Sequence, residues 1–201
     1  PDAKLKSVKQ VPLDSFDAAL VCTPDEVKLD LLTYLLSNGK HVLVEKPLLV
    51  ADDAQLSALE QLGRSTGAVC YTAYNHRFEP HIASLKALLD SGELGKVYYA
   101  RFLYANGTAR DVRNSAWRDQ GCGVLPDLGS HLLDTAAFLF GDALGGFEPW
   151  SFNCFENLSF DHVLFGSKGS PALTMEAMLL SWRNTFRLDV YAERGTAHID
   201  C

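Results

Sequence analysis

The stretch that decides the fold is residues 17–47, DAALVCTPDEVKLDLLTYLLSNGKHVLVEKP. Its first apolar run, at residues 17–23, ends at a Thr-Pro pair and predicts a short strand. Apolar residues then recur at helical spacing until Gly39, a residue type that commonly ends a helix. A second apolar run at residues 41–44 predicts another strand. Strand, helix and strand in so short a stretch are typical of a βαβ unit.

The same alternation continues to about residue 77. A helix is expected at residues 51–67, with an Asp-rich first turn, and a third strand at residues 68–73. Such alternation favours right-handed crossovers in a parallel sheet, and strands this apolar imply helices on both faces. Residues 1–77 are therefore predicted to be the α/β remainder of a doubly wound, Rossmann-like parallel sheet.

A different pattern follows from residue 78 to residue 201. A helix, a long strand at residues 96–105 and a second helix at about residues 128–140 come first. From Trp150 onward short strands are separated by turns, which predicts an antiparallel meander. We expect an α+β domain with a mainly antiparallel sheet, joined to the first domain without a flexible linker.

Composition excludes several function classes. Acidic residues outnumber basic ones, 25 against 18, and no basic cluster could follow a nucleic-acid backbone. The apolar runs are broken well before the roughly 20 residues of a membrane-spanning helix. Five scattered cysteines show no metal-ligand spacing, so we expect reduced thiols, no metal and a cytoplasmic protein. Residues 1–10 lack the apolar core of a signal peptide, and export is not expected.

The tetrapeptide Val44-Glu45-Lys46-Pro47 follows a predicted parallel strand. Ligands bind at the carboxyl ends of such strands, so Lys46 could hydrogen-bond a substrate hydroxyl and exchange its proton. The alternative is a solvated loop lysine followed by a proline that starts the next helix.

The segment 121–131, GCGVLPDLGSH, leads glycines into a predicted helix. Asp127 and His131 are four residues apart and share one helical face. Together they could bind a polyol hydroxyl, with the imidazole carrying a proton and the carboxylate orienting the substrate or the imidazole. The same spacing would suit a mononuclear metal site. Alternatively Asp127 caps the helix and His131 packs in the core, and a third carboxylate, Asp134, complicates the assignment.

Three further residues are candidates for cofactor contacts. Asn75 follows the third strand and should reach the same crevice as Lys46, although Asn is also a common turn residue. Trp117 and Arg118 lie in a polar loop and could cover a cofactor or its phosphate, or else pack on the surface.

Together, CTP after one strand, EKP after the next, YNHRF after the third, then WR and G-x-G-x-x-x-D-x-G-x-H resemble the glucose-fructose oxidoreductase, inositol dehydrogenase and MocA (Gfo/Idh/MocA) family. The resemblance covers about residues 17–145, and more loosely the later turns. It implies a dinucleotide-binding domain at residues 1–77 and a substrate-binding and oligomerisation domain at residues 78–201.

The resemblance also implies roles for individual residues. Lys46, Asp127 and His131 would act at the substrate, while Thr23 and Pro24 would lie beside the dinucleotide. Other expected cofactor contacts come from Glu45 at the nicotinamide ribose, Pro47 after a cis bond, and Asn75, Trp117 and Arg118. The sequence departs from the family in lacking the histidine often found shortly after Thr-Pro, and in placing Cys122 among the glycines.

A more serious departure is that no Gly-x-Gly-x-x-Gly turn precedes residue 17, so we expect a fragment truncated at both ends. The parent protein is predicted to be an NAD- or NADP-dependent oxidoreductase acting on a CH–OH group of a sugar or polyol, without metal. Redox-neutral NAD-dependent glycoside cleavage or epimerisation, and a non-catalytic sugar-sensing or oligomerisation module, stay open. A homodimer or homotetramer through the antiparallel sheet is expected.

Overall fold

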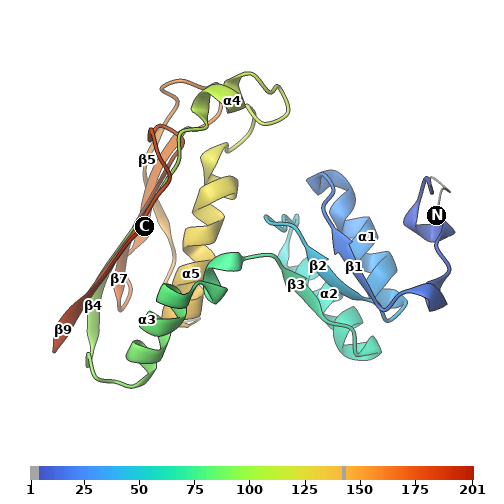
Figure 1. Cartoon of the computed structure of the whole chain (residues 1–201), viewed down its shortest axis with the longest axis horizontal. Helices are drawn as coiled ribbons and strands as arrows, with labels where there is room; N and C mark the ends of the chain where they lie inside the picture. The colour runs from blue at the N-terminus through green and yellow to red at the C-terminus, as the bar shows by residue number, and fades with distance from the viewer. Residues whose placement is uncertain (1–4, 142–143) are drawn as a thin grey trace. The chain divides into compact units, whose positions relative to one another are not determined.

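The structure is a computed structural model that describes residues 5–141 and 144–201. The chain forms two compact units, one ending at Ala73 and the other beginning at Tyr74. Figure 1 labels most of their helices and strands. Each unit has its own buried apolar cluster, and each is described separately below.

The first unit is built on a three-stranded parallel sheet in the order β1-β2-β3. Two helices alternate with its strands, as the sequence predicts. Helix α2 begins where the Asp52 carboxylate accepts a hydrogen bond from the Gln55 amide, and it ends at Gly67, whose φ of 73° is left-handed. The elements are η1 (Val8–Gln10), η2 (Leu13–Ser15), β1 (Ala18–Val21), α1 (Asp25–Ser37), β2 (His41–Val44), α2 (Asp53–Thr66) and β3 (Cys70–Thr72).

Both helices of the first unit cover the same face of the sheet, so the expectation of helices on both faces is wrong for the described residues. Val21, Val42 and Val44 are buried against the helices. By contrast, Leu20 and Leu43 on the opposite face are 67% and 42% exposed. The strand order explains this, because successive right-handed crossovers that advance in one direction place their helices on one side.

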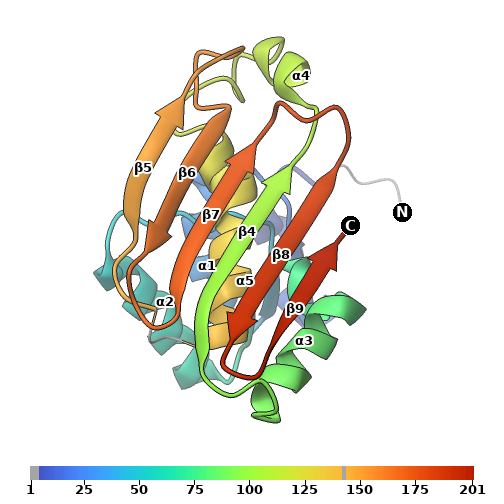
Figure 2. The ribbon, with the colours of Figure 1, turned by 90° about the vertical axis from the view of Figure 1, so that its left-hand side faces the viewer.

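The second unit contains a six-stranded sheet in the order β5-β6-β7-β4-β8-β9. Figure 2 shows this sheet face on, with α3 and α5 behind it. Its elements are η3 (Asn75–Phe78), α3 (Pro80–Asp90), β4 (Val97–Ala105), α4 (Ala109–Arg113), the π-helical turn η4 (Leu125–Gly129), α5 (Ser130–Phe140), β5 (Glu148–Asn153), β6 (His162–Ser167), β7 (Ala172–Met178), β8 (Thr185–Ala192) and β9 (Gly195–Asp200).

Strand β4 occupies the middle of this sheet, which corrects the predicted meander. It pairs antiparallel with β8 but parallel with β7, so it separates two strands that are consecutive in the sequence. The sheet is otherwise antiparallel, as expected. Ala100 and Phe102 of β4 are fully buried beneath the helices. The alternation of apolar and polar residues along a strand cannot reveal such an insertion. It indicates which side of the strand is buried, but not which other strand pairs with it.

No helix of the described ranges is long and apolar enough to cross a membrane. Within the same ranges, no group of three or more His, Cys, Asp or Glu side chains is arranged to hold a metal ion, and no disulfide is formed.

A buried carboxylate stabilises the loop between β5 and β6. Asp161 is fully buried and accepts hydrogen bonds from the backbone amides of Phe155 (2.9 Å), Glu156 and Asn157 (3.1 Å). In Asp161→Asn the new amide nitrogen would face these donors, so we expect a loss of about 3 kcal/mol in the free energy of unfolding, measured by urea titration. The matched change Asp111→Asn, at an exposed carboxylate of α4 in the same unit, should cost much less; equal losses would contradict this account.

Candidate functional site

The turn Glu45-Lys46-Pro47 leaves the carboxyl end of β2, the middle strand of the parallel sheet. The Glu45 amide donates to Val21 O of the neighbouring strand (2.8 Å), and the Lys46 amide donates to the Glu45 carboxylate (2.9 Å). The Lys46–Pro47 bond is cis, as the resemblance implies. Lys46 is partly buried. It lies on a hydrogen-bonded turn at the edge of the sheet where ligands bind in such folds.

The carboxyl end of β1 lies at the same edge, because Val21 and Val44 are paired in register. Thr23 follows there, and its hydroxyl is buried with no hydrogen-bond partner among residues 5–141 and 144–201. Buried polar groups are normally satisfied, so this hydroxyl fits contact with a ligand such as a dinucleotide. Pro24 is exposed beside it and precedes α1.

His131 lies in the first turn of α5 and is 7% exposed. Its ring stacks on that of His76, with centroids 4.7 Å apart and an interplanar angle of 28°. The rings of Tyr74 and Tyr104 meet it edge-on, at 5.6 and 5.8 Å. Thr135 donates to the His131 carbonyl at 2.7 Å. The imidazole is thus buried, as the core-packing alternative requires, but its neighbours are polar aromatic rings and a second imidazole.

Asp127 lies in η4, which begins three residues before the predicted helix start. The N-cap residue of this turn is Val124, so Asp127 does not cap the helix. Its negative charge nevertheless acts on Tyr104: burial, followed by the charges of Asp127 and Glu79, raises the pKa of this phenol above its usual value. Tyr104 therefore neighbours both Asp127 and His131. Short π-helical turns of this kind often occur at functional sites.

Of the two glycines in residues 121–123, Gly123 is required for close packing, whereas a Cβ on Gly121 would meet no atom within 4 Å. Gly123 has a φ of 50°, and a Cβ there would lie 2.2 Å from the Phe160 carbonyl oxygen. The next residue, Val124, donates its amide to that same carbonyl at 2.8 Å. Any larger residue at position 123 would push the start of η4 away from Phe160, in the loop between β5 and β6.

Asp134, which complicated the assignment from sequence, is held by another side chain. Arg77 binds it through two hydrogen bonds, one of them 2.8 Å from Nε to Oδ2, and the Asp134 side chain is only 9% exposed. Fork-like pairing of this type fixes both partners. It ties η3, which carries His76, to α5, which carries His131.

Asn75 and Trp117 are exposed, the latter by 76%, and Arg118 is partly buried. The loop that carries Trp117 and Arg118 is anchored by the buried Asp119, which accepts hydrogen bonds from the Ser159 amide (2.8 Å) and hydroxyl (2.9 Å). The hydrogen bond from the Ser159 amide is the main cause that lowers the pKa of Asp119. The surface alternative for Trp117 and the cofactor role are both compatible with this position.

A cavity of about 180 Å³ adjoins the aromatic residues around His131. Polar and aromatic side chains line it, among them His76, Glu79, His81, Tyr104, Asn184 and Thr185. Imidazole, carboxylate, amide and hydroxyl groups in one small cavity suit a hydroxylated ligand.

Sequence reasoning missed His76 and Tyr104. They stand 55 and 27 residues before His131, on η3 and β4, so no local spacing relates them to it. The only available signal was the place of His76 in Asn-His-Arg directly after a predicted strand. The structure describes Lys46 within the first unit and Asp127, His131, Asn75, Trp117 and Arg118 within the second.

Comparison with known proteins gives concordant matches. The model of the oxidoreductase family with an NAD-binding Rossmann fold matches residues 3–74, and that of the GFO/IDH/MocA C-terminal domain matches residues 82–146. Scyllo-inositol 2-dehydrogenase (NAD(+)) of Bacillus subtilis (strain 168) is 32% identical over 128 residues, which are 62% of this chain and 35% of that protein.

Inositol 2-dehydrogenase of Rhizobium meliloti (strain 1021) is 28% identical over 192 residues, covering 89% of this chain and 56% of that protein. In structure, the chain is similar to levoglucosan dehydrogenase in complex with NADH and levoglucosan, with a TM-score of 0.82, 20% identity, and coverage of 92% of this chain and 54% of that one. The chain thus spans between about a third and just over half of the length of these relatives.

The electrostatic effect of Asp127 on Tyr104 can be tested by titration of this chain. Asp127→Asn removes a negative charge, so we expect the pKa of Tyr104 to fall toward its usual value of about 10 while burial keeps it raised. Tyrosine ¹³C NMR against pH measures it. Because the folded chain holds this proton to higher pH than the unfolded chain, the associated stability is present below about pH 10 and is lost as the pH rises past the folded pKa.

Asp111→Asn, at an exposed carboxylate of α4, is the control and should leave the Tyr104 titration unchanged. An unchanged Tyr104 titration in Asp127→Asn would mean that the carboxylate does not face this phenol.

Proposed function

Since this chain belongs to the Gfo/Idh/MocA family of oxidoreductases, we propose that the full-length protein containing it transfers hydride between NAD or NADP and a CH–OH group of a sugar, polyol or related substrate. The observation that carries the proposal is the place of Lys46, on an ordered turn at the carboxyl end of the middle strand in the unit matched by the NAD-binding model. Several relatives bear the names of inositol or sugar dehydrogenases.

The first unit would hold the nicotinamide cofactor, with Thr23, Pro24, Glu45 and Pro47 at the strand ends. We also propose cofactor contacts from Asn75, Trp117 and Arg118. The buried Thr23 hydroxyl supports this assignment. When bound, the cofactor supplies the hydride acceptor. The protein then has to position the substrate, exclude water and accept the hydroxyl proton.

We assign the hydroxyl proton to Lys46 and His131, and the orientation of the substrate or imidazole to Asp127. As the carbon loses hydride, its hydroxyl oxygen becomes a carbonyl oxygen and its proton must pass to a base. The stacked ring of His76 and the edges of Tyr74 and Tyr104 limit rotation of the His131 ring. An imidazole held in one orientation keeps its ring nitrogens in a fixed position for proton transfer.

The test uses the full-length protein and a panel of inositols and levoglucosan with NAD and NADP. Lys46→Met is expected to lower kcat/KM by about 100- to 10,000-fold, because a proton-transfer group is lost, while cofactor affinity measured by calorimetry changes little. Lys9→Met, at an exposed lysine of the same unit, is the control. Binding of neither cofactor would refute the dehydrogenase proposal in favour of a sensor or scaffold, and turnover without NADH or NADPH release would favour the redox-neutral reaction.

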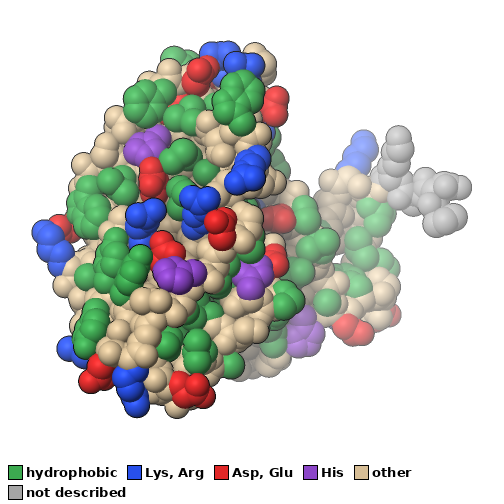
Figure 3. Space-filling model, turned by 60° about the vertical axis from the view of Figure 1, so that its left-hand side comes forward, with side chains coloured by type: hydrophobic (Ala, Val, Ile, Leu, Met, Phe, Trp, Pro, Cys, Tyr) green, Lys and Arg blue, Asp and Glu red, His purple; other side chains and the backbone are tan. Residues whose placement is uncertain are grey.

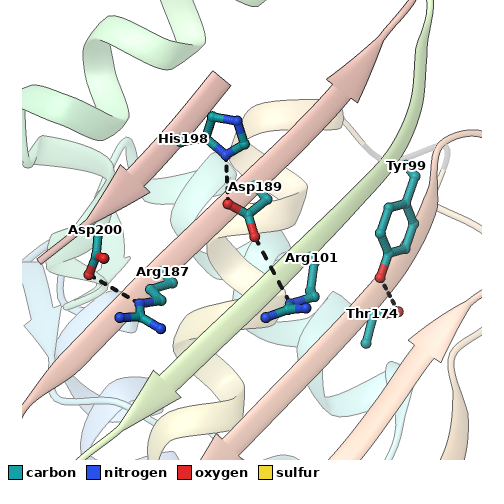
Figure 4. Close-up of polar contacts among 7 residues, drawn as sticks. All are labelled: Tyr99, Arg101, Thr174, Arg187, Asp189, His198 and Asp200. Carbon is teal, nitrogen blue, oxygen red and sulfur yellow. Dashed lines mark hydrogen bonds and ion pairs between the residues drawn. The ribbon is translucent and has the colours of Figure 1, made fainter. Parts of the chain in front are cut away.

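We also propose that the open face of the six-stranded sheet binds a second copy of the chain. This face carries hydrophobic side chains among charges of both signs (Figure 3). On it Arg101 lies 4.0 Å from Asp189, which also contacts His198 at 2.8 Å, while Arg187 pairs with Asp200 at 3.2 Å (Figure 4). A two-fold contact requires a self-complementary surface, and alternating charges supply one.

We propose that the protein is located in the reducing cytoplasm, as its scattered cysteines predict.

Arg101→Glu should disrupt this association, because it places a second negative charge beside Asp189. Light scattering coupled to size exclusion should give a dimer or tetramer mass for the parent sequence and a smaller mass for the variant. Arg64→Glu on α2, in the other unit, should leave the mass unchanged. A monomer for the unaltered sequence, or an unchanged mass in Arg101→Glu, would contradict this interface.

A further inference from the structure

Lys28 is a buried lysine with an unusual set of partners. It lies in the first turns of α1, and only 3% of the residue is exposed. Its ammonium group is 2.8 Å from the carbonyl oxygen of Glu45, 2.9 Å from that of Pro47 and 2.6 Å from the Asp25 carboxylate. A lysine ammonium has three N–H donors, so each is matched by an acceptor.

Two of these acceptors are the carbonyls on either side of Lys46. Strand β2 ends at Val44, so the carbonyls of Glu45 and Pro47 lie beyond the sheet ladder. Backbone carbonyls outside a ladder need another hydrogen-bond donor, and Lys28 supplies one to both. Because the two bonds bracket Lys46, they fix the backbone from which its side chain projects.

The geometry distinguishes this arrangement from an ordinary surface ion pair. An i,i+3 pair such as Asp25 and Lys28 contributes little when exposed. Here the cation is buried, and a buried charge is tolerated only when its partners offset the loss of water. Two long-range bonds to a single turn, 17 and 19 residues away, are a specific means of doing so.

We infer that Lys28 is a positioning residue for Lys46: its ammonium group clamps the carbonyls of Glu45 and Pro47 and so holds the turn that presents Lys46 at the carboxyl end of β2. The structural role stands on this chain alone; the role in turnover rests on the proposed function.

The chain offers a matched control. Lys40 is partly buried in the same unit and also donates its ammonium to a backbone carbonyl, that of Phe16, at 2.8 Å. It directly precedes β2, at the opposite end of that strand from Lys46. Lys40→Met therefore removes the same kind of hydrogen bond at the amino end of β2, away from Lys46.

The first readout is hydrogen exchange in this chain, independent of activity. In Lys28→Met the amides of Glu45 and Lys46 should exchange roughly tenfold faster, because the turn that protects them opens more often. In Lys40→Met they should exchange as in the unaltered chain. Unchanged exchange in Lys28→Met would overturn the proposal, whatever the protein catalyses. If Lys28→Met does not fold, Lys28→Gln replaces it with the same criterion, because its amide nitrogen lies one bond short of the Lys28 Nζ position and cannot bind both carbonyls.

The second readout is turnover in the full-length protein. Lys28→Met should lower kcat by about 10- to 100-fold through misplacement of Lys46, with little change in cofactor affinity. Lys28→Arg, which keeps the charge and the donors, should recover most of the loss. An equal loss of kcat in Lys40→Met, or no recovery in Lys28→Arg, would reduce Lys28 to general stability and overturn its positioning role. Absence of turnover in the unaltered protein refutes the proposed function instead, and leaves the exchange result to stand by itself.

Discussion

Parallel pairing of strands is the constraint on which both units depend. Two parallel neighbours cannot be joined by a tight turn, so the chain must cross from the end of one strand to the beginning of the next. In the first unit the crossovers start at Thr23 and at Glu45-Lys46. In the second, β4 and β7 are parallel partners, and the long connection between them contains Trp117, Asp127 and His131. Most candidate site residues therefore lie on connections that the pairing makes necessary.

Buried polar groups fix these connections in place. Lys28 binds the turn after β2, and Arg77 binds Asp134 and so ties η3 to α5. Asp119 anchors the loop that carries Trp117. Each of these groups is costly to bury and is accepted because several hydrogen bonds satisfy it. The residues assigned to chemistry are thus supported by hydrogen bonds that other residues of the same unit make.

Much of the local structure could be predicted from the sequence. The three parallel strands, their helices and the cis bond before Pro47 were anticipated, the last by family resemblance. Helix α5 was placed correctly except for its π-helical beginning at Leu125. By contrast, the insertion of β4 between β7 and β8 and the placement of α1 and α2 on one face could not be read from periodicity. These features depend on strand order, which is set by packing between distant segments.

The sequence by itself determined the alternation of strands and helices, the family, and the candidates Lys46, Asp127 and His131, because these depend on spacing within short segments. Only the tertiary structure decided that His76 stacks on His131, that Asp134 belongs to Arg77, and that Lys28 holds the carbonyls beside Lys46. Each of these contacts joins residues at least 17 positions apart. Such contacts arise when sheets and helices pack, and local sequence patterns carry no record of them.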